Sequence, residues 1–184
     1  MDEQHGKDLS LETCRLVLQA HEPAEIVALV DGNDTYRNVS GLEPASGLRE
    51  FFVSGELSPD WLAQLRAAEK ADPWKWGFAL LLRGTNLVVG TCGFKGPADG
   101  EGVVEIGYGI VADHQGRGFA SEATAALVAF ASTCGDVRRL RAHTLPEANA
   151  STRVLSKCGF EFIGDVIDPD DGPVWRWERD PEQR

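Results

Sequence analysis

A glycine-rich turn between a predicted strand and a predicted helix is the segment of this sequence best suited to bind a phosphate group. Residues 103–111 form an apolar strand, residues 112–114 a short turn, and residues 115–120 (QGRGFA) the start of a helix. Glycines let the main chain approach a ligand closely, and the first N–H groups of a helix lack partners within the helix. The turn is not a Walker loop, because no Gly-Lys-Ser/Thr sequence follows it, and the spacing of a dinucleotide-binding loop is absent.

Four segments in a fixed order resemble one enzyme superfamily. The spacing of Gln115, Gly118 and Ala120 (Q-x-x-G-x-A) resembles the acetyl-coenzyme A loop of the GNAT N-acetyltransferases. Three further segments are similar to the branch that includes the ribosomal-protein N-terminal acetyltransferases: residues 13–18 (TCRLVL) to its first strand, 105–108 (EIGY) to its central strand, and 149–160 (NASTRVLSKCGF) to its last helix and following turn. The resemblance covers roughly residues 10–165 and is specific for the superfamily, but it does not identify a substrate.

The resemblance implies that acetyl-coenzyme A is the co-substrate and that no metal takes part. Main-chain N–H groups of the loop would bind its pyrophosphate, with the hydroxyl of Ser121 nearby. The side chain of Arg117 would either add a charge near a phosphate or be a solvated loop residue. The loop residues predicted to bind the cofactor are Gln115, Gly116, Arg117, Gly118, Phe119, Ala120 and Ser121.

Two glycines, Gly107 and Gly109, interrupt the strand that leads into the loop. Glycine inside a strand often marks a bulge or the close approach of a ligand. The resemblance implies that this strand splays from its neighbour, so that the pantetheine arm pairs with the main chain of Ile110 and Val111. The alternative is close packing of a helix on the sheet.

Glu105 is the candidate for a catalytic base. Acetyl transfer needs a neutral amine, and a lysine side chain with a pKa of about 10.4 is almost wholly charged at pH 7. A base within reach of the amine, directly or through water, therefore helps. The resemblance implies this role, because catalytic glutamates of several GNAT enzymes occupy this strand position. Alternatively, the carboxylate of Glu105 pairs with an arginine or binds the substrate amine.

Ser151 and Asn149 lie in the predicted last helix and are further candidates. The resemblance implies that Ser151 serves the leaving thiolate, although a serine there could also be a helix cap. In this branch an asparagine contacts the pantetheine or acetyl region, but its usual position is Ala148, so Asn149 is a shifted candidate for the same contact. Many members carry a tyrosine as thiolate acid where this chain has Leu155. Ser151 or water would then protonate the thiolate, unless no acid is used.

Composition limits the classes of function. The 184 residues fit one domain, and the formal net charge of −11 argues against a nucleic-acid partner, which needs clustered Lys and Arg. That charge either favours cationic amine substrates or serves solubility. Four separated cysteines without a C-x-x-C pair argue against a zinc site and fit a cytoplasmic protein. No apolar run reaches membrane-spanning length and the N-terminus is no signal peptide, so no membrane partner is expected.

Periodicity and capping signals predict the elements that must position these residues. Strands are predicted at 14–20, 74–82, 87–94, 103–111, 139–144, 160–166 and 174–178, and helices at 22–30, 58–71, 118–134 and 147–157. Residues 31–56 are predicted to be either partly helical around residues 48–53 or a functional flap. Strand alternation assigns Trp74 and Trp76 to the core, and it places Tyr108 on the strand face opposite Glu105, as a packing residue.

These elements predict an α/β (α+β) fold, with a mixed central sheet of about seven strands and flanking helices. The resemblance implies that they form one GNAT-like domain with a splayed central pair of strands. Residues 1–10 are expected to form a flexible lead and residues 11–184 the N-acetyltransferase domain. The predicted activity is transfer of acetyl from acetyl-coenzyme A to a primary amine of a small molecule or a peptide, by a monomer or homodimer. The alternative is a non-catalytic acyl-coenzyme A-binding module or sensor.

Overall fold

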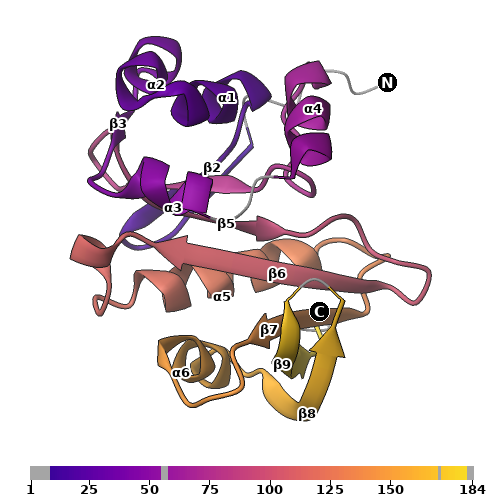
Figure 1. Ribbon diagram of the computed structural model, residues 1–184. Helices are drawn as coiled ribbons and strands as arrows, with labels where there is room; N and C mark the ends of the chain where they lie inside the picture. Colours follow the sequence, from indigo (N-terminus) through magenta and orange to yellow (C-terminus); the bar gives the residue numbers. More distant parts are fainter. Residues whose placement is uncertain (1–8, 55–57, 170, 182–184) are drawn as a thin grey trace.

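One mixed β-sheet runs through the computed structural model, which describes residues 9–54, 58–169 and 171–181 (Figure 1). The strand order is β1-β2-β4-β5-β6-β7-β9-β8, and β3 pairs with β5 beside this path. The strands are β1 Ser10–Glu12, β2 Leu16–Ala20, β3 Glu43–Pro44, β4 Phe78–Leu82, β5 Leu87–Phe94, β6 Val103–Ile110, β7 Arg139–Thr144, β8 Glu161–Asp168 and β9 Gly172–Arg179.

The sheet consists of two antiparallel halves joined by a short parallel seam. One half runs from β1 to β6, and the other contains β7, β9 and β8. At the seam, β6 pairs with β7 at only three positions, which are Val103 with Arg139, Val104 with Leu140, and Glu105 with Arg141. Beyond Glu105 the two strands separate. The predicted splayed central pair is therefore confirmed.

Six α-helices and one short 3₁₀ turn, η1, are found in the described residues. Phe51 of α3 lies over Gly109 of β6, whereas Phe130 of α5 packs against Phe94 on the other face of the sheet, so α3 and α5 cover opposite faces (Figure 1). The helices are α1 Pro23–Asp31, α2 Asn33–Ser40, α3 Leu48–Ser54, α4 Pro59–Ala67, α5 Phe119–Ser132 and α6 Ala150–Lys157, and η1 spans Ala112–His114.

The core lies between the sheet and α5. Capping residues also determine where several helices begin. Leu127 of α5 and Leu80 of β4 are completely buried. The Ser58 hydroxyl accepts a hydrogen bond from the N–H of Trp61 at the start of α4, as its Ser-Pro sequence predicts. Glu22 and Glu25 form a capping box at the start of α1. Local chemistry therefore determines where these helices begin.

Two short strands raise the number above the predicted seven. β1 begins at Ser10, inside the segment expected to be a flexible lead, because Ser10–Glu12 pairs with β2. β3 consists of Glu43 and Pro44, which pair with β5. Strands of two or three residues have no readable alternation, so only their pairing with another strand reveals them. The rest of the expected lead, residues 1–8, lies outside the described residues.

The segment between α1 and β4 also differs from the prediction in two places. Of the two alternatives for residues 31–56, the structure has the helix around residues 48–53, which is α3, but α2 was not predicted. The strand expected from residue 74 begins only at Phe78, because Trp74 and Trp76 lie in a turn closed by the Trp76 N–H bond to the Asp72 carbonyl. The predicted packing of Trp74 is nevertheless observed, with its ring 4.4 Å from that of Phe94.

His21 gives the fold a pH dependence of its own. The ring is buried after β2, with Nε2 at 3.3 Å from the Thr91 hydroxyl, and burial lowers the pKa of His21 from 6.5 to about 4. Between these pH values the unfolded chain binds more protons than the folded chain, so stability falls as pH falls. This group alone is expected to lower the free energy of unfolding by about 2 kcal/mol between pH 7 and pH 5.

Urea unfolding at the two pH values measures this effect, with His21→Leu as the variant that cannot titrate. Its loss of stability between pH 7 and pH 5 is expected to be smaller than the parent's by about the same 2 kcal/mol. Equal losses in parent and variant would contradict the assignment.

Candidate functional site

A cavity of about 460 Å³ opens beside the edge of β6 that β7 leaves free. This volume is in the range of small-molecule binding sites. Strand β6, the turn before α5, the first turn of α5, helix α6 and one residue of α3 contribute to its wall. The lining residues are Phe51, Tyr108, Gly109, Ile110, His114, Gln115, Gly116, Gly118, Phe119, Ala120, Ser121, Ala150, Ser151, Arg153, Val154 and Lys157.

The glycine-rich turn forms part of the wall of this cavity, next to the N-terminus of α5. Gly116 and Gly118 have φ values of +73° and +83°, which glycine adopts without the strain that a side chain would bring. Gly118 is the N-cap of α5 and has no side chain to satisfy the first N–H groups of the helix. The Gln115 amide donates a 2.8 Å hydrogen bond to the Ile110 carbonyl, which holds the turn against β6. The turn can therefore bind an anion.

Six of the seven predicted loop residues line the cavity, and Arg117 does not. The Arg117 side chain is exposed, and its guanidinium donates a 3.0 Å hydrogen bond to the Asp113 carbonyl. The alternative that Arg117 is a solvated loop residue fits this arrangement better. The six lining residues are Gln115, Gly116, Gly118, Phe119, Ala120 and Ser121.

The main chain of β6 alternates between its two neighbours. The Lys95 N–H donates to the Glu105 carbonyl, and the Val111 N–H donates to the Val89 carbonyl, so the odd-numbered residues direct their main chain toward β5. The even-numbered residues, Tyr108 among them, direct theirs toward the edge that β7 leaves free. This open edge can pair with an extended ligand.

Ile110 therefore lies where it was predicted, but Val111 does not. Ile110 lines the cavity, and its carbonyl is already occupied by Gln115. Val111 is buried, its N–H is paired with β5, and its carbonyl accepts from the N–H of His114. Tyr108 takes its place at the open edge. The Tyr108 side chain was interpreted as a packing residue, but it also lines the cavity. The one-residue alternation of the strand would have identified Tyr108 and Ile110 as the pair at the open edge.

Helix α6 places Ser151 in the cavity and Asn149 at its own N-terminus. The Asn149 side chain accepts a 3.0 Å hydrogen bond from the Thr152 N–H, so Asn149 is the helix cap and Ser151 is not. Asn149 does not line the cavity. The Tyr108 hydroxyl donates to the Ser151 carbonyl at 3.3 Å, and burial raises the pKa of Tyr108 to about 12. Leu155 is buried and offers no acid.

Two cations in the cavity wall were not predicted. Arg153 and Lys157 are exposed residues of α6, and both line the cavity. Their spacing of four places them on one side of the helix. A third cation, Arg15, lies over the Phe119 ring at 4.8 Å and donates to the Arg117 carbonyl at the same turn. The spacing in α6 was a readable signal, whereas Arg15 comes near the turn only through the fold.

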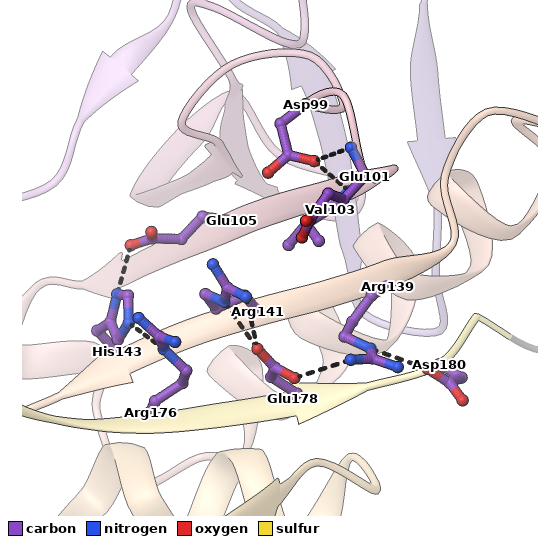
Figure 2. Close-up of polar contacts among 10 residues, drawn as sticks. All are labelled: Asp99, Glu101, Val103, Glu105, Arg139, Arg141, His143, Arg176, Glu178 and Asp180. Atoms are coloured by element: carbon purple, nitrogen blue, oxygen red, sulfur yellow. Dashed lines mark hydrogen bonds and ion pairs between the residues drawn. The ribbon is translucent and has the colours of Figure 1, made fainter. Parts of the chain in front are cut away.

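Glu105 lies outside the cavity wall, at the point where β6 and β7 begin to separate (Figure 2). Its side chain is 21% exposed, and its Oε1 lies 2.6 Å from Nζ of Lys95 and 3.2 Å from Nδ1 of His143. Burial lowers the pKa of Lys95, but the contact with Glu105 and the nearby acids Asp171 and Asp168 outweigh it, so the net direction is upward. The site can hold a carboxylate next to an ammonium group, which is the pairing that an amine substrate would require.

Metal binding and membrane crossing find no support in the described part of the chain. None of its His, Cys, Asp and Glu side chains form a group of three or more that could hold a metal ion. No helix within these ranges is long and apolar enough to cross a membrane.

Comparisons with known proteins agree with this geometry. Residues 15–161 match the family model described as "Acetyltransferase (GNAT) domain". The N-acetyltransferase YoaA of Bacillus subtilis, described as uncharacterized, is 29% identical over 156 residues, which are 84% of each chain. Protein p20 of Bacillus licheniformis, also described as an uncharacterized N-acetyltransferase, is 36% identical over 87 residues. That match covers 47% of this chain and 49% of p20, so it spans about half of each protein.

A solved structure supports the fold. The chain is similar to RimL, described as a ribosomal L7/L12 alpha-N-protein acetyltransferase in complex with coenzyme A, with a TM-score of 0.61. The match covers 94% of this chain and 98% of RimL at 19% sequence identity. At this identity the likeness concerns the fold alone.

Proposed function

The chain belongs to the GNAT acetyltransferase family and is an acetyltransferase, and from this premise we propose that it transfers acetyl from acetyl-coenzyme A to a primary amine. The observation that carries the proposal is the cavity, which joins an anion-binding turn to an open strand edge that leads toward Glu105. A pyrophosphate and an extended pantetheine arm have the chemistry that these two surfaces would bind. The turn would bind the pyrophosphate, and the open strand edge would bind the pantetheine arm.

Acetyl-coenzyme A would lie with its pyrophosphate at the first turn of α5. There the N–H groups and the helix dipole favour negative charge. Arg153 and Lys157 face the same cavity and would add two positive charges near the phosphates. The pantetheine arm would pair with the main chain of Tyr108 and with the N–H of Ile110, which point to the open edge of β6.

The reaction would begin with removal of a proton from the acceptor ammonium by Glu105, directly or through water. The neutral amine nitrogen then attacks the thioester carbonyl carbon, and a carbon–nitrogen bond forms. The carbon–sulfur bond breaks, and the second proton that the nitrogen loses on becoming an amide passes to the leaving coenzyme A thiolate through a donor that it reprotonates. Ser151 lines the cavity and is one candidate donor, water is a second, and the protonated Tyr108 hydroxyl is a third.

The acceptor would approach from the face of β6 that carries Glu105 and α3. Nζ of Lys95 lies 2.6 Å from Oε1 of Glu105, and an acceptor ammonium would make the same kind of contact. A small amine or the N-terminus of a peptide would therefore have to displace Lys95 or bind beside it. Several structural neighbours are described as ribosomal-protein acetyltransferases, so peptide amines belong among the acceptors to be tested.

The test follows release of free thiol from acetyl-coenzyme A with a panel of amines that includes amino acids, polyamines, aminoglycosides and peptides with free N-termini. Thiol release that depends on one class of amine, with a matching mass increase of that amine, is the expected result. Binding of acetyl-coenzyme A without amine-dependent release across the panel would instead favour the acyl-coenzyme A sensor.

A further inference from the structure

His143 is a nearly buried histidine on β7 that the proposed reaction has not yet used. Its side chain is 8% exposed and lies on the same face of the sheet as Glu105 (Figure 2). Arg176 reaches it from β9, the strand that pairs with β7 at this residue. Three neighbouring strands thus bring Glu105, His143 and Arg176 into one row.

The contacts of His143 determine which ring nitrogen carries the proton. Nε of Arg176 lies 3.3 Å from Nε2 of His143 and donates a hydrogen bond to it. A guanidinium can only donate, so Nε2 must accept and cannot carry a proton. In a neutral imidazole the single proton is then on Nδ1. Nδ1 is the nitrogen that lies 3.2 Å from Oε1 of Glu105.

The two contacts of Glu105 leave its carboxylate asymmetric. Both Nδ1 of His143 and Nζ of Lys95 approach Oε1, which is buried. Oε2 has no hydrogen bond or ion pair with any residue in the described ranges. One oxygen is therefore held by the protein while the other is available.

We propose that the Arg176–His143 pair orients the carboxylate of Glu105, so that Oε2 is presented to the acceptor amine. His143 is a positioning residue in this arrangement. It cannot act as the base itself, because Nε2 is occupied by Arg176 and Nδ1 carries the proton. This inference rests on the proposed role of Glu105 and adds the device that fixes the direction of its free oxygen.

The other charged groups near this row are engaged elsewhere or act on the same oxygen. On β7, Arg141 lies on the face of Glu105 but forms an ion pair with Glu178 of β9 at 2.7 Å. Lys95, after β5, contacts Oε1 and lies 3.9 Å from Asp171. Among the described contacts, only His143 links the side chain of Glu105 to β9, through its hydrogen bond with Arg176.

The first test reads the tautomer and needs no activity. Long-range ¹H–¹⁵N correlation spectra of labelled protein distinguish the two neutral forms of a histidine ring, and the His143→Asn spectrum identifies the signal. The Nδ1–H form is expected for His143 in the parent. In Arg176→Met, the fixed donor to Nε2 is lost, and the signal is expected to move toward the Nε2–H form. An Nε2–H form in the parent would overturn the proposal.

The second test is a double-mutant cycle of His143→Ala with Glu105→Gln. Misplacement of a reacting group by about 1 Å can cost about 100-fold. We therefore expect His143→Ala to lower kcat by about 10-fold to 100-fold, with little change in the KM for acetyl-coenzyme A. His143→Asn keeps an N–H donor close to the position of Nδ1, so it is expected to recover much of the lost rate.

The cycle separates the two proposals. If His143 acts through Glu105, His143→Ala should have no further effect when Glu105→Gln is already present. Fully additive losses, or a parent-like kcat for a folded His143→Ala, would overturn the positioning role alone. A parent-like kcat for Glu105→Gln would overturn the base, and the positioning role with it. Melting temperatures of all variants identify any loss that is only structural.

Discussion

Replacement of Glu105 by glutamine is expected to lower kcat by about 10²-fold to 10⁴-fold, the usual range for a positioned acid–base group. Glutamine has the size of glutamate but cannot accept the proton of an ammonium group. The rate of the variant should recover as pH rises, because hydroxide then supplies the missing deprotonation. The affinity for acetyl-coenzyme A should hardly change, since Glu105 does not line the cavity. Steady-state kinetics over a range of pH measure all three effects.

Glu101→Gln is the matched control, because Glu101 is an exposed residue in the turn just before β6. It removes the same charge and should leave kcat unchanged. If Glu105 only binds the cationic amine, KM for the amine should rise while kcat stays near the parent value. A pH–rate profile of Glu105→Gln that runs parallel to the parent profile, with kcat intact, would exclude the base.

A carboxylate placed in the first turn of α5 is expected to weaken the binding of acetyl-coenzyme A strongly. Ala120 is the second residue of this helix and lines the cavity. In Ala120→Glu the new charge would compete with the pyrophosphate for the same N–H groups and repel it. An acidic residue at this position favours the helix itself, so the fold should be retained. Affinity measured by calorimetry should fall by about 100-fold, which corresponds to about 2.7 kcal/mol.

Ala125→Glu provides the control, because Ala125 is exposed on α5 and does not line the cavity. It introduces the same side chain into the same helix and should bind acetyl-coenzyme A like the parent. The ligand-induced rise in melting temperature should likewise persist in Ala125→Glu and be much smaller in Ala120→Glu. Gly118 is less suitable for this test, since its φ of +83° would strain any β-branched residue. Parent-like binding by Ala120→Glu would refute the assignment of the turn.

The parts of the fold that the sequence predicts are those encoded by neighbouring residues. The Ser58 cap, the glycines of the turn at residues 115–120 and the alternation along β6 each depend on local chemistry. The six loop residues at the cavity and the position of Ser151 follow from these elements, with help from the family resemblance. The resemblance alone does not take into account the one-residue alternation of hydrogen bonds, which directs the main chain of Val111 toward β5.

The parts that could not be predicted depend on strand order. Glu105, His143 and Arg176 come from segments far apart in the chain, and they meet only because β6, β7 and β9 are neighbours in the sheet. No spacing in the sequence reveals this order. His143 therefore carries no local signal that links it to Glu105. β1 and β3 were missed for the same reason, since each is stabilised by its partner strand rather than by its own residues.

The short seam between β6 and β7 has a consequence for the cooperativity of the whole molecule. Only three residue pairs join the two half-sheets through strand pairing, and the packing of α5 against α6 adds to this connection. Such halves can open as separate units, which amide hydrogen exchange would detect as two levels of protection. A pantetheine arm on the open edge of β6 would occupy the place of a missing strand. With the arm bound, the two half-sheets would open together, and amide exchange would show a single level of protection.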